Sequence, residues 1–282
     1  MTLFDRYIAV DWSGANTPRT GKDSIWIGES GRPSINPPTR AAAMAVVAER
    51  LREGGRIFLG FDFVFGYPRG AAQALAGKPG WRSVWNAIAN AIVDSDDNSS
   101  NRFAVAETFN RILGEPHFWG HPHQHRYDHL RPKKPLHGYP AIPERRAAEA
   151  LATGAQPVWK LTGVGSVGSQ SLLGIARLAQ LKRAFPEIGI WPFETDFERA
   201  LKAVTIVEIY PSLFPRPGEL IPPDREQVET CVRRFAELDA VGRLGSVLGA
   251  PADVEREPLL AEEGWIAGVG HEHLLHTLEK AA

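Results

Sequence analysis

Residues 7–15, YIAVDWSGA, form a short apolar run that ends on Asp11 and then turns at Gly14. A few bulky or β-branched apolar residues before a turn signal are typical of a buried strand. A carboxylate at the end of such a strand is costly to bury alone, so Asp11 needs a cation or hydrogen-bond donors. This stretch therefore predicts a central strand that delivers an acid at its carboxyl end.

The same pattern occurs twice more in the chain. Residues 57–62, IFLGFD, end on Asp62, and residues 204–210, VTIVEIY, carry Glu208 near their end. In open α/β sheets, sites form beyond the carboxyl ends of the strands. We therefore expect Asp11, Asp62 and Glu208 to meet at one edge of a sheet.

Composition limits the classes of protein to consider. The 282 residues suffice for one large domain or for a core domain with a big insertion, and 43% hydrophobic and 23% charged residues are typical of a globular chain. A net charge of -1 excludes a global basic field, so nucleic-acid binding would need a local patch. The single cysteine, Cys231, excludes an intrachain disulfide and fits a reducing compartment.

The chain carries no signal for a membrane or for secretion. Its first residues lack the basic start and apolar run of a signal peptide, and the richest apolar stretch, residues 41–48, is too short to span a bilayer. We expect a soluble, cytoplasmic protein with no membrane partner.

The order of elements predicts an α/β fold whose mixed sheet is flanked by helices. The alternation of strands and helices breaks after Asp62 and resumes near residue 201. We therefore expect a core of residues 1–62 and 201–282, and within the same domain a large, mostly helical insertion or cap of residues 63–200. In chain order, the expected elements are strands 23–29 and 34–35, helix 40–53 with Thr39 as N-cap, helices 81–92, 144–153 and 169–185, strand 204–210, and helices 225–248 and 271–280.

The late helix contains one acid in an unexpected place. At 100° per residue, Asp239 falls inside the apolar face of helix 225–248, between Phe235 and Gly242. A carboxylate on a core-facing surface needs a cation or a donor. Asp239 is therefore either a fourth acid of the site or a buried aspartate held by backbone donors or an arginine.

The four acids together predict a metal site. Hard oxygen ligands without nearby sulfur favour Mg²⁺ or Mn²⁺ over zinc, and we expect Asp11, Asp62 and Asp239 to hold the metal, with Glu208 among the catalytic acids. Two divalent ions about 4 Å apart would relieve the repulsion between the carboxylates and promote in-line attack of water on a phosphodiester.

Several motifs resemble a known family. The ordered segments AVDWSGA, GFDFVFGYP, VEIYPS, LDA and EEGW, with WKLTGVGSVGSQSLLGI and IWPFE between them, resemble the family called domain of unknown function 429. That family is predicted to adopt a ribonuclease H-like fold and to act as nucleases. The resemblance implies that Asp11 is the first-strand acid, Asp62 the fourth-strand acid, Asp239 the acid of the last helix, and Glu208 the glutamate before the Tyr-Pro pair.

A glycine-rich turn supplies candidate substrate contacts. Residues 163–168, GVGSVG, match the GxGxxG pattern of dinucleotide-binding proteins, but the residues before them lack the apolar strand that such a fold requires. We expect the turn to hold a substrate phosphate through backbone N–H groups at a helix start. The candidate substrate-binding residues are Ser13, Gly14, Lys160, Gly163, Gly165, Gly168 and Glu194.

A histidine-rich segment remains open to interpretation. Residues 117–137 hold six histidines among aromatic and basic side chains. Zinc is a weak prospect, because the spacing is not helical and no cysteine is near. The segment is either a substrate-facing loop or a solvated loop.

These observations favour a metal-dependent nuclease or phosphodiesterase that acts on nucleic acid or a small phosphorylated substrate. One alternative is a nucleotide-binding or phosphoryl-transfer protein, in which residues 11–14 form a phosphate loop as in actin-like ATPases, although no duplicated core is visible. The other alternative is a binding scaffold without catalysis.

Overall fold

The computed structural model describes the chain except residues 1, 136–140, 216–217, 219 and 277–282. Within the described residues, six strands and ten α-helices form a mixed α/β fold. The strands are β1 (Arg6–Asp11), β2 (Trp26–Glu29), β3 (Arg32–Ile35), β4 (Ile57–Phe61), β5 (Gly189–Ile190) and β6 (Val204–Glu208).

The six strands form one sheet in the order β3-β2-β1-β4-β6-β5. Strands β1, β4, β6 and β5 are parallel, whereas β2 runs antiparallel to both of its neighbours. The carboxyl ends of β1, β4 and β6 therefore lie at the same edge of the sheet.

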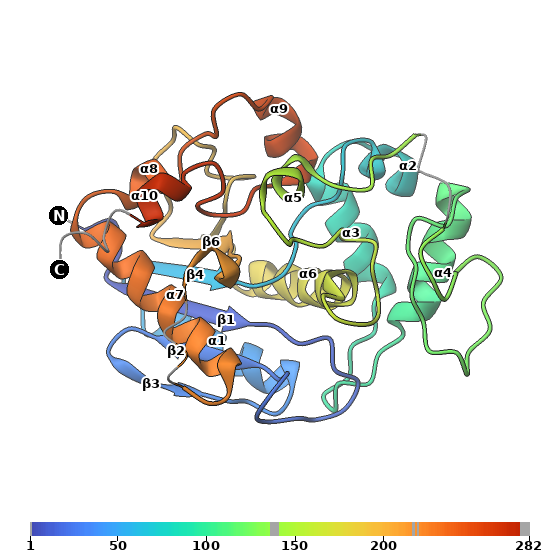
Figure 1. Cartoon of the computed structure of the whole chain (residues 1–282), viewed down its shortest axis with the longest axis horizontal. Helices are drawn as coiled ribbons and strands as arrows, with labels where there is room; N and C mark the ends of the chain where they lie inside the picture. The colour runs from blue at the N-terminus through green and yellow to red at the C-terminus, as the bar shows by residue number, and fades with distance from the viewer. Residues whose placement is uncertain (1, 136–140, 216–217, 219, 277–282) are drawn as a thin grey trace.

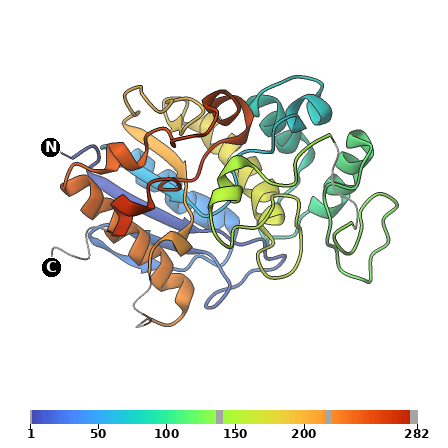
Figure 2. The same cartoon turned by 45° about the horizontal axis from the view of Figure 1, so that its top comes forward.

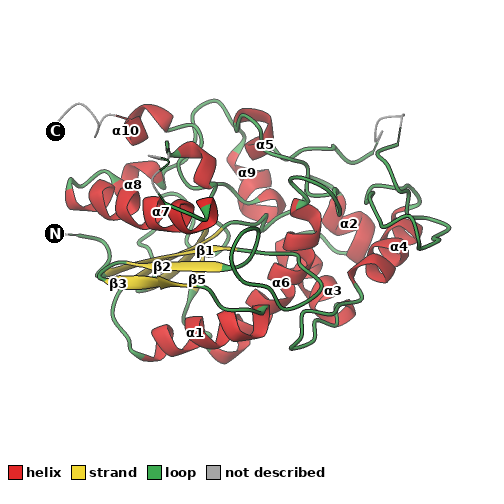
Figure 3. Cartoon of the chain, turned by 60° about the horizontal axis from the view of Figure 1, so that its bottom comes forward, coloured by secondary structure: helices red, strands yellow, loops and turns green. Residues whose placement is uncertain are grey.

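Helices cover both faces of the sheet (Figure 3). Ile8 and Val10 of β1 pack on the side of α1 (Arg40–Arg52) and α6 (Val167–Ala184), as the alternation of side chains along a strand requires. The alternate residues of β1 pack on the other side with α7 (Pro223–Ala240) and α8 (Leu244–Val247). The expected N-cap is confirmed, because the Thr39 hydroxyl accepts a hydrogen bond from Ala42 N at 3.1 Å.

The region expected to be an insertion divides into two parts. Helices α2 (Ala71–Ala76), α3 (Trp81–Ala91) and α4 (Arg102–Leu113) lie beyond the carboxyl ends of β1 and β4, as Figure 1 and Figure 2 show. Helix α6 and strand β5, in contrast, belong to the sheet and its helical layer. Residues 167–184 thus lie in the helical layer of the sheet and residues 189–190 in the sheet itself, although both precede the boundary expected at residue 200.

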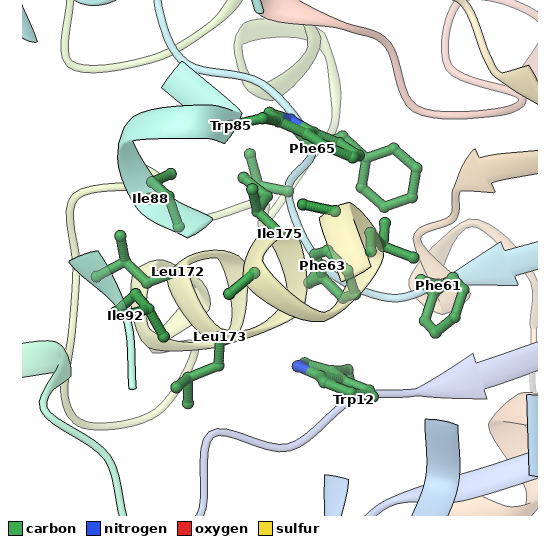
Figure 4. Packing of buried hydrophobic residues seen from close by; sticks show 14 of the residues in the cluster. Trp12, Phe61, Phe63, Phe65, Trp85, Ile88, Ile92, Leu172, Leu173 and Ile175 are labelled. Atoms are coloured by element: carbon green, nitrogen blue, oxygen red, sulfur yellow. The ribbon is translucent and has the colours of Figure 1, made fainter. Parts of the chain in front are cut away.

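A row of aromatic side chains joins the sheet to these outer helices (Figure 4). Phe63 packs against Trp12 and Phe65 at ring-centroid distances of 5.6 and 5.2 Å, and Phe65 reaches Trp85 of α3 at 6.3 Å. Gly174 of α6 leaves the space that the Phe63 ring fills, because a Cβ atom there would lie 2.4 Å from the ring. The outer helices thus share one continuous core with the sheet.

The last helices differ in length from the expected ones. Helix 225–248 is broken, since α7 ends at Ala240 and Gly242 adopts a positive φ of 72° before α8 begins. The remaining elements are α5 (Ala147–Leu151), a 3₁₀ turn (Pro211–Leu213), α9 (Arg256–Pro258), a π-helical turn (Leu259–Glu263) and α10 (Glu272–His276). The end of the expected helix 271–280 lies outside the described residues.

The π-helical turn anchors the chain that leaves β4. Tyr67 N donates to the Glu262 carbonyl at 3.2 Å, and a Cβ atom on Gly66 would lie 2.0 Å from the Glu263 carbonyl oxygen. The Glu262 carboxylate accepts from Gly70 N at 2.9 Å and from Ala72 N, and so caps the start of α2. Glycine at position 66 is therefore required for this close approach of two backbones.

Within the described chain, no helix combines the length and apolar character needed to cross a membrane.

Candidate functional site: a carboxylate cleft

A cleft of about 650 Å³ opens at the carboxyl ends of β1, β4 and β6. It is bordered by the turn after β1, the glycine-rich turn before α6 and the start of α7. We name it the carboxylate cleft, after its six acidic lining residues: Asp11, Asp23, Asp62, Glu149, Glu208 and Asp224. Arg19 is the one Lys or Arg residue among the described lining residues, so acidic residues predominate in the lining.

Asp11 and Asp62 lie side by side in the cleft, as the sequence predicts. The parallel register pairs Val10 with Phe61, and Asp62 N donates to the Val10 carbonyl at 3.0 Å, so the next residue of each strand is adjacent. Alternation along both strands turns the two carboxylates toward the face that carries α7. Asp11 is only 9% exposed, and no described residue donates a hydrogen bond to either carboxylate.

The surroundings of this pair disfavour two negative charges. Burial raises the pKa of Asp11 well above its usual range, and the charges of Asp62, Asp224 and Asp23 raise it further. Burial, followed by the charge of Glu208, raises the pKa of Asp62 to about 7. Without a cation, the pair therefore retains protons to a higher pH than two free aspartates would.

Glu208 lines the cleft as expected, but its carboxylate is already bound. Its Oε1 accepts from Arg146 Nη2 at 2.5 Å, and its Oε2 accepts from Arg146 Nη1 and Phe65 N, both at 2.9 Å. Its register partner Phe61 packs on the α6 side, so the Glu208 side chain leaves its strand on the opposite face of the sheet from Asp11 and Asp62 but still reaches the same cleft. Burial raises the pKa of Glu208, and the Arg146 charge opposes that rise.

Asp239 does not belong to the cleft, and its assignment as a metal ligand is wrong. Its carboxylate accepts hydrogen bonds from Leu3 N and Phe4 N, both at 2.9 Å, and from the Tyr7 hydroxyl. Tyr7 and Asp11 are four residues apart on β1, which places Asp239 roughly 13 Å from the site end of the strand. The alternative of a buried aspartate held by backbone donors is the correct one.

Asp224 is the helix acid that the cleft contains. It lies in the first turn of α7, and its Oδ2 accepts from Asp23 N at 3.0 Å. Its charge raises the pKa of Asp11, and both residues line the same cleft. The signal for it was present in the sequence, because Pro222 and Pro223 mark a helix start and an acid follows directly.

The glycine-rich turn and the turn after β1 form the walls of the cleft. Gly163 and Gly165 line it with positive φ angles of 86° and 68°, and Ser13 and Gly14 also line it. Gly168 is not a lining residue, since a Cβ atom there would lie 2.3 Å from the Val158 carbonyl oxygen. Its role is close packing at the start of α6.

Two expected substrate contacts are turned away from the cleft. Lys160 Nζ donates to the Val164 carbonyl at 2.5 Å and to Gln156 Oε1 at 3.2 Å, so it braces the glycine-rich turn. Glu194 forms ion pairs with Arg82 at 2.5 Å and Lys182 at 2.9 Å. Neither residue lines the cleft, and both already have partners: neutral oxygens for Lys160 and two cations for Glu194.

The histidine-rich segment also lies outside the cleft lining. His117 and His121 are buried, and the His117 ring lies 5.1 Å from the ring of Trp159. His137 lies outside the described residues. No group of three His, Cys, Asp or Glu side chains in the described chain is arranged to hold a metal ion.

No family model, curated protein or solved structure matches this chain. The chemical interpretation of the carboxylate cleft therefore depends on its own geometry.

Proposed function

We propose that the carboxylate cleft is the active site of a hydrolase that binds Mg²⁺ or Mn²⁺ and cleaves phosphoester bonds, as a nuclease or phosphodiesterase. The observation that carries this proposal is the Asp11–Asp62 pair. Two adjacent carboxylates without a hydrogen-bond donor, Asp11 buried and Asp62 half-buried, cost stability unless a cation neutralises them. Buried carboxylates with a purely structural role are normally paired with a cationic side chain, as Glu208 is with Arg146.

The donor set suits a magnesium-like ion. Mg²⁺ is commonly held by one or two carboxylates and completes its shell with waters and substrate phosphate oxygens, so three protein ligands are not required. Asp11 and Asp62 would hold the ion, and Asp224 adds negative charge beside Asp11. When bound, the ion would polarise a phosphoryl oxygen and activate water.

The walls of the cleft supply the other requirements of a phosphoester site. The turn of residues 163–166 brings backbone into the cleft at the start of the 18-residue helix α6, whose N-terminal end favours an anion. Ser13 adds a hydroxyl to the lining. These groups would orient a phosphate against the Asp11–Asp62 pair.

We extend the proposal to the fold family. A mixed sheet with one antiparallel strand, β2, and acids at the ends of β1 and β4 supports a ribonuclease H-like architecture and membership of the domain of unknown function 429 family. In that assignment Asp224 replaces Asp239 as the acid of the last helix.

The test is hydrolysis with and without metal. EDTA-treated protein should be inactive, and Mn²⁺ or Mg²⁺ should restore cleavage of bis(p-nitrophenyl) phosphate or of labelled DNA and RNA oligonucleotides. Asp11→Asn and Asp62→Asn should each reduce the rate by more than about 100-fold. The control Asp96→Asn, at an exposed position outside the cleft lining, should leave it unchanged.

Activity that survives EDTA, or that both cleft variants retain, would refute the proposal. The glycine-rich wall favours one other candidate, a nucleotide-binding phosphoryl-transfer protein. Hydrolysis of ATP in place of the diesters in the same assay would identify it. Tight binding of oligonucleotide without any turnover would instead indicate a scaffold.

A further inference from the structure

Arg146 is a fully buried cation that directly adjoins the carboxylate cleft. It precedes α5, and its side chain is 0% exposed. Its Nε and Nη2 donate to Glu149 Oε1 at 2.7 and 2.5 Å, its Nη1 and Nη2 donate to Glu208, and its Nη1 also donates to the Glu263 carbonyl at 2.7 Å. These five bonds use all five N–H donors of a guanidinium, so Arg146 has none left for a substrate.

The hydrogen bonds from Arg146 also occupy the carboxylate of Glu208. Both of its carboxylate oxygens accept from the guanidinium, and Oε2 also accepts from Phe65 N at 2.9 Å. A divalent ion that bridged Asp62 and Glu208 would have to displace a planar, bidentate arginine that three chain segments hold in place. Such pairs are strong because two parallel charge-assisted bonds form at once.

We infer that Arg146 permanently takes the place of a second cation, so that the carboxylate cleft binds one divalent ion per chain, at the Asp11–Asp62 pair, and not two. The inference rests on the proposed function and refines it. Asp11 supports the position of the single ion, because it is nine-tenths buried, lines the cleft and has no donor among the described residues. Arg146 and Glu208 are then positioning residues that set the charge beside the ion.

The experiment is a Mn²⁺ binding isotherm, measured by equilibrium dialysis and by the EPR signal of free Mn²⁺. Wild-type protein should bind one Mn²⁺ in the cleft. Asp62→Asn should weaken this binding by more than about 10-fold. Glu208→Gln should change it by less than about threefold, as should the control Glu187→Gln at an exposed position.

Glu208→Gln is a fair variant because Arg146 keeps Glu149 as its counter-ion. Two Mn²⁺ per wild-type chain, both lost in Asp11→Asn, would overturn the inference while leaving the proposed function intact. So would a loss of affinity in Glu208→Gln as large as that in Asp62→Asn. Wild-type protein that retains no Mn²⁺ would instead overturn the proposed function, and with it the inference. If Glu208→Gln does not fold, the wild-type stoichiometry alone decides.

Discussion

Replacing Asp62 with asparagine should stabilise the metal-free protein at neutral pH. The side chain keeps its shape, but the negative charge next to Asp11 and Glu208 disappears. In the folded protein, burial and the Glu208 charge raise the pKa of Asp62 from 3.8 to about 7. At about 1.4 kcal/mol for each pH unit between these values, ionised Asp62 destabilises the fold by at most about 4 kcal/mol.

Because the pKa of Asp62 is raised in the folded protein, this effect is confined to a defined range of pH. The unfolded chain releases the Asp62 proton near pH 4, whereas the folded chain keeps it until about pH 7. Because the unfolded state then binds fewer protons, wild-type stability falls as the pH rises through this window and levels off above it. Asp62→Asn should lack this fall, so its advantage should grow from near zero at pH 4 to about 2–4 kcal/mol at pH 7.5.

The measurement is chemical and thermal unfolding of EDTA-treated protein at several pH values. For a chain of this size, the expected gain corresponds to an increase in Tm of roughly 4–8 °C at pH 7.5. The exposed control Asp96→Asn should show no pH-dependent difference from wild type. Added Mn²⁺ should reverse the order, since it stabilises the wild-type site and has lost a ligand in the variant.

Two results would refute this reasoning. The first is an Asp62→Asn protein that is less stable than wild type at pH 7.5 without metal, which would mean that the carboxylate has a favourable partner. The second is a difference of equal size at pH 4 and pH 7.5, which would mean that the effect does not come from ionisation.

Three further changes test the structural assignments. Asp239→Asn should lower the free energy of unfolding by about 1–3 kcal/mol, because the carboxylate accepts hydrogen bonds from two backbone N–H groups and a tyrosine hydroxyl. Stabilisation by Mn²⁺ in thermal melts should not change, and its loss would show that Asp239 is a metal ligand after all. Gly66→Ala should lower the free energy of unfolding, measured with denaturant, by more than about 3 kcal/mol, since its Cβ atom would lie 2.0 Å from a carbonyl oxygen. The control Gly245→Ala, whose Cβ atom would have its nearest neighbour at 3.8 Å, should be nearly neutral, and equal effects of the two variants would disprove the close approach at Gly66. Arg40→Met should lower the free energy of unfolding by about 3–5 kcal/mol, since the fully buried guanidinium binds Asp94 and the carbonyls of the turn after β1. A melting curve indistinguishable from that of the exposed control Arg111→Met would contradict this.

Local sequence patterns were enough to predict the central strands and the acids at their carboxyl ends. Short apolar runs ending on Asp11 and Asp62 predicted two buried strands, and both residues lie together at the carboxyl edge of the sheet. Local chemistry sufficed for these features, because side-chain alternation, turn residues and the cost of burying a carboxylate act within a few positions of the chain.

Which acid of α7 reaches the cleft depends on the tertiary fold. Asp224 and Asp239 belong to the same helix, α7, and are separated by 15 residues or about 22 Å along its axis. Periodicity identified the buried face of the helix and so singled out Asp239. It carries no information on which end of the helix lies at the carboxyl edge of the sheet, because that depends on how α7 crosses β1 and β2.

The state of Glu208 likewise depends on distant parts of the chain. Its partner Arg146 is 62 residues away in the sequence, and the carbonyl that completes the guanidinium's contacts belongs to Glu263. A strand pattern identifies an acid that needs compensation, but it does not say whether the partner is an arginine or a metal ion. That choice is made only when the fold brings remote charges together, because electrostatic compensation depends on distance in space and not on separation along the chain.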